Sequence, residues 1–232
     1  MADLYAVIGN PVAHSKSPGI HAQFARDCGQ DMEYRRIEAP RGGFAAAVEA
    51  FRASGGRGLN VTLPFKGEAF RYCTRPSERA RQAEAVNTLS FGEEVRGDTT
   101  DGAGLVIDLE RNLGFALAGK RILLMGAGGA AQGVVAALLS AGAAALVIAN
   151  RTLDKAAALA LRFPPARSSP YGELSGQDFD LVLNATSSGL SGDVVTLPEG
   201  VLHKGALAYD MVYGRDTPFL RAARQAGAGT SD

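Results

Sequence analysis

The sequence predicts an α/β protein of two domains with mainly parallel sheets, and three observations support this. Short apolar segments typical of strands alternate with segments of helical periodicity. A glycine-rich turn separates a strand from a helix after residue 125. The alternation restarts after Gly119, so we expect a boundary within 100–119 and assign the domains to 1–101 and 102–232.

The first predicted helix is marked at both ends by residues with clear boundary preferences. A strand at 4–9 is followed by a helix at 17–29. Ser17 is its expected N-cap, Pro18 its first helical residue and Gly29 the residue past its end. The further elements expected in this half are a strand at 32–39, a helix at 42–55, a strand at 57–63, a helix opened by Pro64 at 64–73, a hairpin of strands at 84–91 and 93–100, and a helix at 101–114.

The second half repeats a simpler pattern. A strand, a glycine turn, a helix, a strand and a helix are expected across 121–163. Two more strands follow at 179–186 and 206–213, and a last helix begins near Thr217. Strands that alternate with helices in this way favour a parallel sheet.

The segment GAGGAA, residues 126–131, lies between a strand and a helix and fits the pattern G-x-G-x-x-A. In dinucleotide-binding loops such a pattern lets Gly126 form a tight turn, lets the backbone at Gly128 approach a pyrophosphate, and lets helix and strand pack closely at Ala131. The N–H groups at the helix N-terminus then face the phosphates. The alternative is a junction that simply requires small residues.

The end of the next strand distinguishes between the two common dinucleotides. An acidic residue there would bind a ribose 2′-hydroxyl, whereas this chain has Asn150, Arg151 and Thr152, with Lys155 one turn later. A guanidinium can bind a 2′-phosphate through paired hydrogen bonds, and a neutral amide does not repel it. We therefore expect NADP(H), with an ordinary polar strand end as the alternative.

Polar residues in the first half suggest a substrate site. Ser15 and Ser17 lie on the turn into the first helix, where their hydroxyls and the helix N-terminus suit a carboxylate, although Ser17 could simply cap the helix. Asn60 and Thr62 alternate on one strand and share a face. Lys66 falls in the first turn of a helix, where a cation is locally unfavourable; this suggests a function, and a solvated surface lysine is the alternative.

Two further residues have both a structural and a functional interpretation. Asn87 interrupts an apolar strand and is either a satisfied core amide or a hydrogen-bonding group of a pocket. Asp101 opens a helix, where an acid is favoured as a cap without any catalytic role.

Composition argues against several classes of protein. Lys and Arg together number 24, as do Asp and Glu, so no net charge attracts nucleic acid or anionic lipid. Cys28 and Cys73 form no CxxC or Cys/His cluster, and the three histidines show no metal-ligand spacing. The N-terminus does not resemble a signal peptide and no apolar run is long enough to span a membrane, so we expect a cytoplasmic protein without a metal.

A set of segments, in this order, resembles the shikimate dehydrogenase family: VIGNPVAHSKSP, NVTLPFK, AVNT, TTDG, GAGGAA, NRT, NATSSG and YDMVYGRDTPFL. The resemblance covers nearly the whole chain. It implies an N-terminal α/β substrate-binding domain and a C-terminal Rossmann-type NADP-binding domain with a cleft between them. It also implies NADPH-dependent reduction of 3-dehydroshikimate to shikimate, on the pathway through chorismate to the aromatic amino acids, by a monomer or homodimer.

The resemblance also implies roles for individual residues. Lys66 and Asp101 would be the catalytic pair, in which Asp101 orients Lys66. The substrate would contact Ser15 and Ser17 through its carboxylate, and Asn60, Thr62, Lys66, Asn87, Asp101 and Tyr213 elsewhere. The cofactor would contact Gly126, Ala127, Gly128, Gly129, Ala130, Asn150, Arg151, Thr152, Lys155, Thr186 and Met211.

The chain departs from the family pattern at two places. The family commonly has Asn-Thr-Asp-Gly where this chain has Thr99 to Gly102, which changes the local hydrogen bonding but keeps Asp101. The family also continues beyond GAGTSD with a final helix that packs on the first domain and carries a glutamine in contact with substrate. We expect its absence to expose apolar surface and loosen the cleft.

Three other functions fit parts of the sequence. A quinate/shikimate dehydrogenase would be favoured by a preference for NAD, against which Asn150 and Arg151 argue. A non-catalytic NADP-binding sensor would not need the retained Lys66 and Asp101. Another two-domain dehydrogenase, such as a folate-linked one, does not explain the paired serines beside a helix N-terminus, which favour a small carboxylate.

Overall fold

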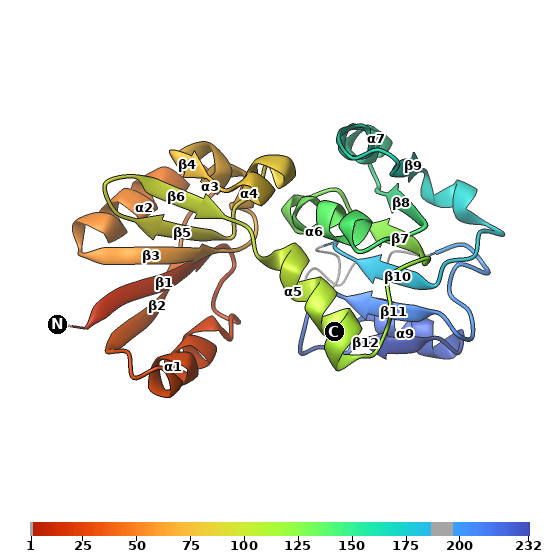
Figure 1. The fold of residues 1–232 in the computed structure, drawn as a ribbon, viewed down its shortest axis with the longest axis horizontal. Helices are drawn as coiled ribbons and strands as arrows, with labels where there is room; N and C mark the ends of the chain where they lie inside the picture. Colours follow the sequence, from red (N-terminus) through yellow and green to blue (C-terminus); the bar gives the residue numbers. More distant parts are fainter. Residues whose placement is uncertain (1, 187–196) are drawn as a thin grey trace. The chain divides into compact units, whose positions relative to one another are not determined.

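The computed structural model describes residues 2–186 and 197–232, which form two compact α/β units, Met1–Asp101 and Gly102–Asp232 (Figure 1). The predicted fold class, a two-domain α/β protein with a Rossmann-like second sheet, is confirmed. Within the described part of the chain, no helix combines the length and the apolar character that crossing a membrane requires.

The first unit is built on a mixed six-stranded sheet in the order β2-β1-β3-β5-β6-β4. β1 pairs in parallel with β2 and β3, whereas β5 is antiparallel to both β3 and β6. The elements of this unit are β1 (Asp3–Gly9), α1 (Ser17–Asp27), β2 (Met32–Glu38), α2 (Phe44–Ala53), β3 (Gly56–Val61), α3 (Lys66–Tyr72), β4 (Arg75–Pro76), α4 (Glu78–Ala83), β5 (Thr88–Phe91) and β6 (Val95–Asp98).

One face of this sheet carries the core of the unit. Ile8, Leu59 and Leu89 are buried against Phe44 of α2 and against Phe65, which precedes α3. α1 lies on the opposite face, beside β1 and β2 (Figure 1). Because side chains alternate along a strand, the residues between these core positions point to the face that α1 covers in part.

Several local predictions in this unit are wrong. Lys16, not Ser17, is the N-cap of α1, because Ser17 is already helical and its N–H donates to Ser15 Oγ at 3.3 Å. The helix after β3 begins at Lys66 rather than Pro64, because Pro64 lies in a turn that is closed by the N–H of Phe65 donating to the backbone oxygen of Thr62 at 3.0 Å. α4 was not expected; Ser77 caps it by accepting the N–H of Ala80 at 3.2 Å.

The second unit has a fully parallel six-stranded sheet in the order β12-β11-β10-β7-β8-β9. Residues of α5, α6 and α7 cover one face, and α9 covers the other (Figure 1). Its elements are α5 (Asp101–Ile107), a π-helical turn (Asp108–Asn112), β7 (Arg121–Met125), α6 (Gly129–Ser140), β8 (Ala145–Ala149), α7 (Leu153–Arg162), β9 (Arg167–Ser169), a 3-10 turn (Tyr171–Leu174), β10 (Leu181–Asn184), β11 (Leu207–Asp210), α9 (Pro218–Gln225) and β12 (Gly229–Ser231).

Among the described residues of this unit, the unexpected elements are β9, β12 and the 3-10 turn, all short. The helix expected over 101–114 is shorter than predicted as an α-helix, because it ends at Ile107 and continues as the π-helical turn. Short strands at the edges of a sheet carry little sequence signal, since their formation depends on a neighbour that is already in place.

Candidate functional site

Topology brings the polar residues of the first unit to one edge of its sheet. β1, β3 and β6 run in the same direction, so the segments that follow them leave the sheet on the same side. β5 runs the opposite way, and its first residues therefore begin at that same edge. Residues from four separate parts of the sequence meet there: Ser15 and Ser17, Asn60 to Lys66, Asn87 and Thr88, and Thr100 and Asp101.

Lys66 and Asp101 form a close ion pair at this edge. Lys66 Nζ lies 2.6 Å from Asp101 Oδ2, and the two side chains are 13% and 18% exposed. Each is the first residue of its helix, α3 and α5 respectively. Lys66 is therefore not a solvated surface lysine, which was the alternative interpretation of its position.

Asn87 holds the other oxygen of the same carboxylate. Its Nδ2 donates to Asp101 Oδ1 at 2.8 Å and also lies 2.9 Å from Thr100 Oγ1. Its Oδ1 accepts the backbone N–H of Thr100 at 3.1 Å and the hydroxyl of Thr88 at 2.9 Å. Because both carboxylate oxygens bind side chains from other elements, a helix cap alone does not account for the contacts of Asp101.

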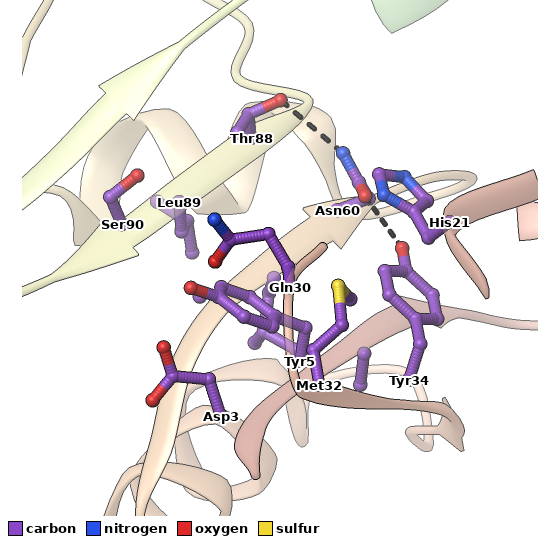
Figure 2. A pocket seen from close by; sticks show the side chains of 13 residues that line it. Asp3, Tyr5, His21, Gln30, Met32, Tyr34, Asn60, Thr88, Leu89 and Ser90 are labelled. Atoms are coloured by element: carbon purple, nitrogen blue, oxygen red, sulfur yellow. Dashed lines mark hydrogen bonds between the residues drawn. The ribbon is translucent and has the colours of Figure 1, made fainter. Parts of the chain in front are cut away.

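Asn60 continues these contacts across the sheet (Figure 2). Its Nδ2 lies 3.4 Å from Thr88 Oγ1, and its Oδ1 accepts the hydroxyl of Tyr34 at 2.5 Å. Asn60 and Thr88 are paired positions of β3 and β5, so their side chains share a face. Thr62 is outside this set of contacts. It follows β3, and its methyl group packs so close to Gly9 that a Cβ added to Gly9 would lie 2.5 Å from it.

His21 and Tyr34 form one wall of a cavity of about 270 Å³ on this face (Figure 2). Their rings are stacked, with centroids 4.4 Å apart and planes 9° from parallel. Burial lowers the pKa of the His21 imidazole, and a hydrogen bond with Asn60 opposes the shift. Figure 2 also shows Tyr5, Met32 and other side chains on the same face of the sheet.

The two serines lie close together between β1 and α1. Ser15 is 6% exposed, and its Oγ donates to Ser17 Oγ at 3.1 Å. Arg36 of β2 donates to the backbone oxygen of Ser15 at 2.6 and 3.1 Å, which fixes the turn. Paired hydroxyls beside the N-terminus of an eleven-residue helix suit a carboxylate.

Thr99, the departure from the family pattern, is 3% exposed. Among the described residues its Oγ1 is the buried side-chain polar atom that has no hydrogen-bond partner. The adjacent Thr100 and Asp101 make the contacts given above, so the substitution leaves the local arrangement of the ion pair in place.

The glycine loop of the second unit lies between β7 and α6. Gly126 has φ +107°, a conformation that favours glycine, and its N–H donates to Ala149 at 2.7 Å. A Cβ on Gly128 would meet nothing within 4 Å. Gly129 and Ala130 begin α6, whose first N–H groups have no partner within the helix. Open space around the loop and unpaired donors fit a phosphate group.

The residues after β8 carry charge of the opposite sign to a phosphate. Arg151, Thr152 and Lys155 are exposed, and Asn150 Nδ2 donates to the backbone oxygen of Thr152 at 2.9 Å. β7 and β8 are parallel neighbours, so these residues leave the sheet at the same edge as the glycine loop. The first charged residue after β8 is Arg151, a cation rather than an acid, which fits a nucleotide that has a 2′-phosphate.

A buried polar network supports the loops after β10 and β11. Asn184 donates to Asp210 at 3.1 Å and accepts the hydroxyl of Thr186 at 2.7 Å, and Thr217 donates to Asp210 at 2.6 Å. The network places Thr186 and Met211 at the sheet edge that carries the glycine loop. Tyr213 lies on the loop after β11 and is 48% exposed. Ser187, Ser188 and Gly189 of the segment NATSSG are outside the described residues.

Sequence reasoning missed Tyr34, Thr88 and Thr100 in the first unit and Asn184 and Asp210 in the second. Asn184 and Asp210 each end an apolar strand, so the signal that singled out Asn87 could have identified them, whereas Tyr34 lies in the largely polar strand MEYRRIE and gives no such signal. In the described residues, no group of three or more His, Cys, Asp or Glu side chains is arranged to hold a metal ion.

Comparisons with known proteins assign both units. A family model described as the shikimate dehydrogenase substrate binding domain matches residues 7–89. A second model, described as shikimate / quinate 5-dehydrogenase, matches residues 109–191. Together the two models cover most of the chain.

Individual relatives and solved structures agree with these models. A shikimate dehydrogenase (NADP(+)) from Dechloromonas aromatica is 57% identical over 98% of this chain and 85% of its own length. An Ael1 enzyme from Pseudomonas putida is 48% identical, with a TM-score of 0.90 over 100% of this chain and 87% of its own. Shikimate 5-dehydrogenase from Thermus thermophilus, in complex with NADP(H) and shikimate, is 33% identical, with a TM-score of 0.86 over 99% of this chain and 86% of its own.

Proposed function

This chain belongs to the shikimate dehydrogenase family, and on that premise we propose that it catalyses the reversible NADPH-dependent reduction of 3-dehydroshikimate to shikimate. In the cell this reaction would serve the synthesis of chorismate and the aromatic amino acids in the cytoplasm. The observation that supports it best is the Lys66–Asp101 pair, at 2.6 Å, on a face lined by hydrogen-bonding groups.

The chemistry requires a proton donor beside a ketone oxygen. NADPH, when bound, supplies the hydride that adds to the carbonyl carbon. Negative charge then develops on the oxygen, and the ammonium of Lys66 stabilises this charge and delivers a proton. Asp101 orients Lys66 through Oδ2 and can accept a hydrogen bond from a substrate hydroxyl.

The remaining residues of the first unit fit the other groups of shikimate. Ser15 and Ser17 bind the carboxylate through their hydroxyls, and Asn60, Thr62 and Asn87 bind ring hydroxyls. Amide side chains suit hydroxyl groups because each offers both a donor and an acceptor. Residues 1–101 thus form the substrate-binding and catalytic domain in this proposal.

Residues 102–232 form the NADP-binding domain. The loop from Gly126 to Ala130 binds the pyrophosphate, and Asn150, Arg151, Thr152 and Lys155 bind the 2′-phosphate. Thr186 and Met211 contact the cofactor near its nicotinamide, and Tyr213 contacts the substrate. We expect the protein to act as a monomer or homodimer with a small-molecule substrate.

The reduction can be tested directly on the 232-residue chain. Incubation with 3-dehydroshikimate and NADPH should consume both in equal amounts and form shikimate, identified by chromatography against a standard. The Lys66→Met variant is the matched control and should form shikimate at least about a hundredfold more slowly. NADPH binding without any product from the wild-type chain would instead support a binding-only protein.

A further inference from the structure

The polar side chains at the substrate edge form one chain of hydrogen bonds with a fixed direction. A backbone N–H can only donate, so the bond from Thr100 makes Asn87 Oδ1 an acceptor. The Asn87 nitrogen therefore faces Asp101 Oδ1, at 2.8 Å, and donates to it. Two independent partners thus determine the orientation of the Asn87 amide.

The same reasoning determines the orientation of Asn60. Thr88 gives its hydroxyl proton to Asn87 Oδ1, so its oxygen accepts from Asn60 Nδ2. With its nitrogen turned toward Thr88, Asn60 presents Oδ1 to the Tyr34 hydroxyl, which donates at 2.5 Å. Figure 2 shows these two bonds on either side of the Asn60 amide.

Tyr34 begins this series of hydrogen bonds, at the end away from Asp101. Its ring is held by the stack with His21, which also bonds to Asn60. Burial raises the pKa of the Tyr34 phenol, which therefore keeps its proton at neutral pH, and a hydrogen bond from Ser17 opposes the rise. The direction of donation is then continuous: Tyr34 to Asn60, Asn60 to Thr88, Thr88 to Asn87, and Asn87 to Asp101.

We infer that Tyr34 is a positioning residue for the substrate site: its hydroxyl donates to Asn60 Oδ1 and, together with Thr88 on the other side, holds the Asn60 amide in one orientation. The inference rests on the proposed function, because Asn60 and Asn87 are groups proposed to contact ring hydroxyls of the substrate. A phenol has a single proton, and giving it to Asn60 commits the Asn60 nitrogen to the side of Thr88. Without that proton only the 3.4 Å bond to Thr88 holds the amide, and its orientation toward the substrate is less well defined.

The test uses Tyr34→Phe, which removes the hydroxyl and keeps the stacked ring. We expect the Kd for shikimate, measured by titration calorimetry, to rise about 5- to 10-fold, the usual effect of losing one neutral hydrogen bond. The Kd for NADP+ should change less than about 2-fold, and the thermal unfolding midpoint by only a few degrees. The matched control is Tyr72→Phe, since the Tyr72 hydroxyl also forms hydrogen bonds with two side chains, those of Glu49 and Arg52, which belong to α2. This variant should bind shikimate like the wild type.

A second variant separates positioning from packing. Thr88→Val interrupts the same chain one link further on and should weaken shikimate binding to a similar extent. If both substitutions act through the same series of hydrogen bonds, adding Tyr34→Phe to Thr88→Val should raise the Kd for shikimate by less than about 2-fold more. A double variant in which the two single effects multiply would overturn the inference.

The outcomes distinguish this inference from the function on which it rests. Equal shikimate binding by the wild type and Tyr34→Phe would contradict the positioning role and leave the proposed function intact. A parallel loss of shikimate binding, NADP+ binding and thermal stability would reduce Tyr34 to a packing residue. A wild-type chain that binds no shikimate would contradict the proposed function and the inference together.

Discussion

Replacing Lys66 by Met removes the ammonium and keeps an unbranched side chain of similar length. In the wild type the ammonium lies 2.6 Å from Asp101, in a pair whose members are less than one-fifth exposed. If this ammonium meets the charge that develops on the carbonyl oxygen, its loss should lower kcat by about 10²- to 10⁴-fold. That is about 3–5 kcal/mol of transition-state stabilisation, at 1.36 kcal/mol for each factor of ten.

The same substitution should have a small effect on folding. Removing one member of a fully buried pair costs about 3–5 kcal/mol, because a charge is left uncompensated. Here Asp101 keeps the hydrogen bond from Asn87 and is 18% exposed, so we expect a cost of about 1 kcal/mol, or a fall of about 3 °C in Tm. The variant therefore remains folded at room temperature, and a loss of rate reports on chemistry.

Initial rates of NADPH formation from shikimate and NADP+ give kcat and KM separately. Lys120→Met is the matched control, since Lys120 also lies near an aspartate, Asp180, at 3.2 Å, but in the second unit, before β7 and so at the end of that strand opposite the glycine loop. It should keep kcat within about 2-fold. A Lys66→Met variant with kcat within about tenfold of wild type, or one in which only KM changes, would refute the role of Lys66 in the chemical step.

Three further substitutions test other parts of the structure. Arg151→Ala should raise KM for NADP+ about 10-fold or more and KM for NAD+ less than about 2-fold, because only NADP+ has a 2′-phosphate for the guanidinium. An equal rise in both KM values, measured by steady-state kinetics, would exclude this role of Arg151. Gly102→Ala should lower Tm by about 5 °C in calorimetry, since the added Cβ would lie 2.7 Å from Gly133 O and from Ala137 Cβ. Gly104→Ala on the same helix is the control: its Cβ would meet nothing within 4 Å, so this variant should not destabilise the protein. The Arg79 guanidinium beside Asp98 lowers the pKa of that carboxyl below its ordinary value. The ionised carboxylate therefore stabilises the folded protein above about pH 4, and this stabilisation is lost as the pH falls through the lowered pKa. Asp98→Asn should consequently lower Tm at about pH 7, and its difference from the wild type should shrink as the pH falls below about 4; a difference that does not change with pH would contradict this origin.

Features that depend on neighbours in the chain could be predicted from the sequence. Gly126 and Gly128 follow an apolar strand directly, and their conformational freedom and small size are local properties. The alternation of elements predicted the fold class for the same reason, because periodicity is local. Lys66 was singled out because a cation is unfavourable in a first helical turn, and the structure places it in an ion pair.

Features that depend on strand register could not be predicted in the same way. Tyr34 and Thr88 reach Asn60 from two strands on opposite sides of β3, and only the pairing of the sheet brings them onto one face. The start of α3 was misplaced because proline is common both in turns and at helix starts, and Pro64 lies in the turn. Ser17 was misassigned as a cap because Ser15, two residues earlier, accepts the N–H of Ser17 instead.

The most direct single measurement is the ratio of kcat/KM for NADP+ to that for NAD+, with shikimate as the substrate and NADPH or NADH formation followed by absorbance. The predicted result is turnover with at least about a tenfold preference for NADP+. Turnover requires the Lys66–Asp101 pair and the substrate-binding residues to act as assigned, and the preference for NADP+ requires Arg151 to do so. A preference for NAD+, or faster turnover of quinate than of shikimate, would contradict the assignment of cofactor or substrate. No turnover with either dinucleotide would contradict the proposed reaction itself.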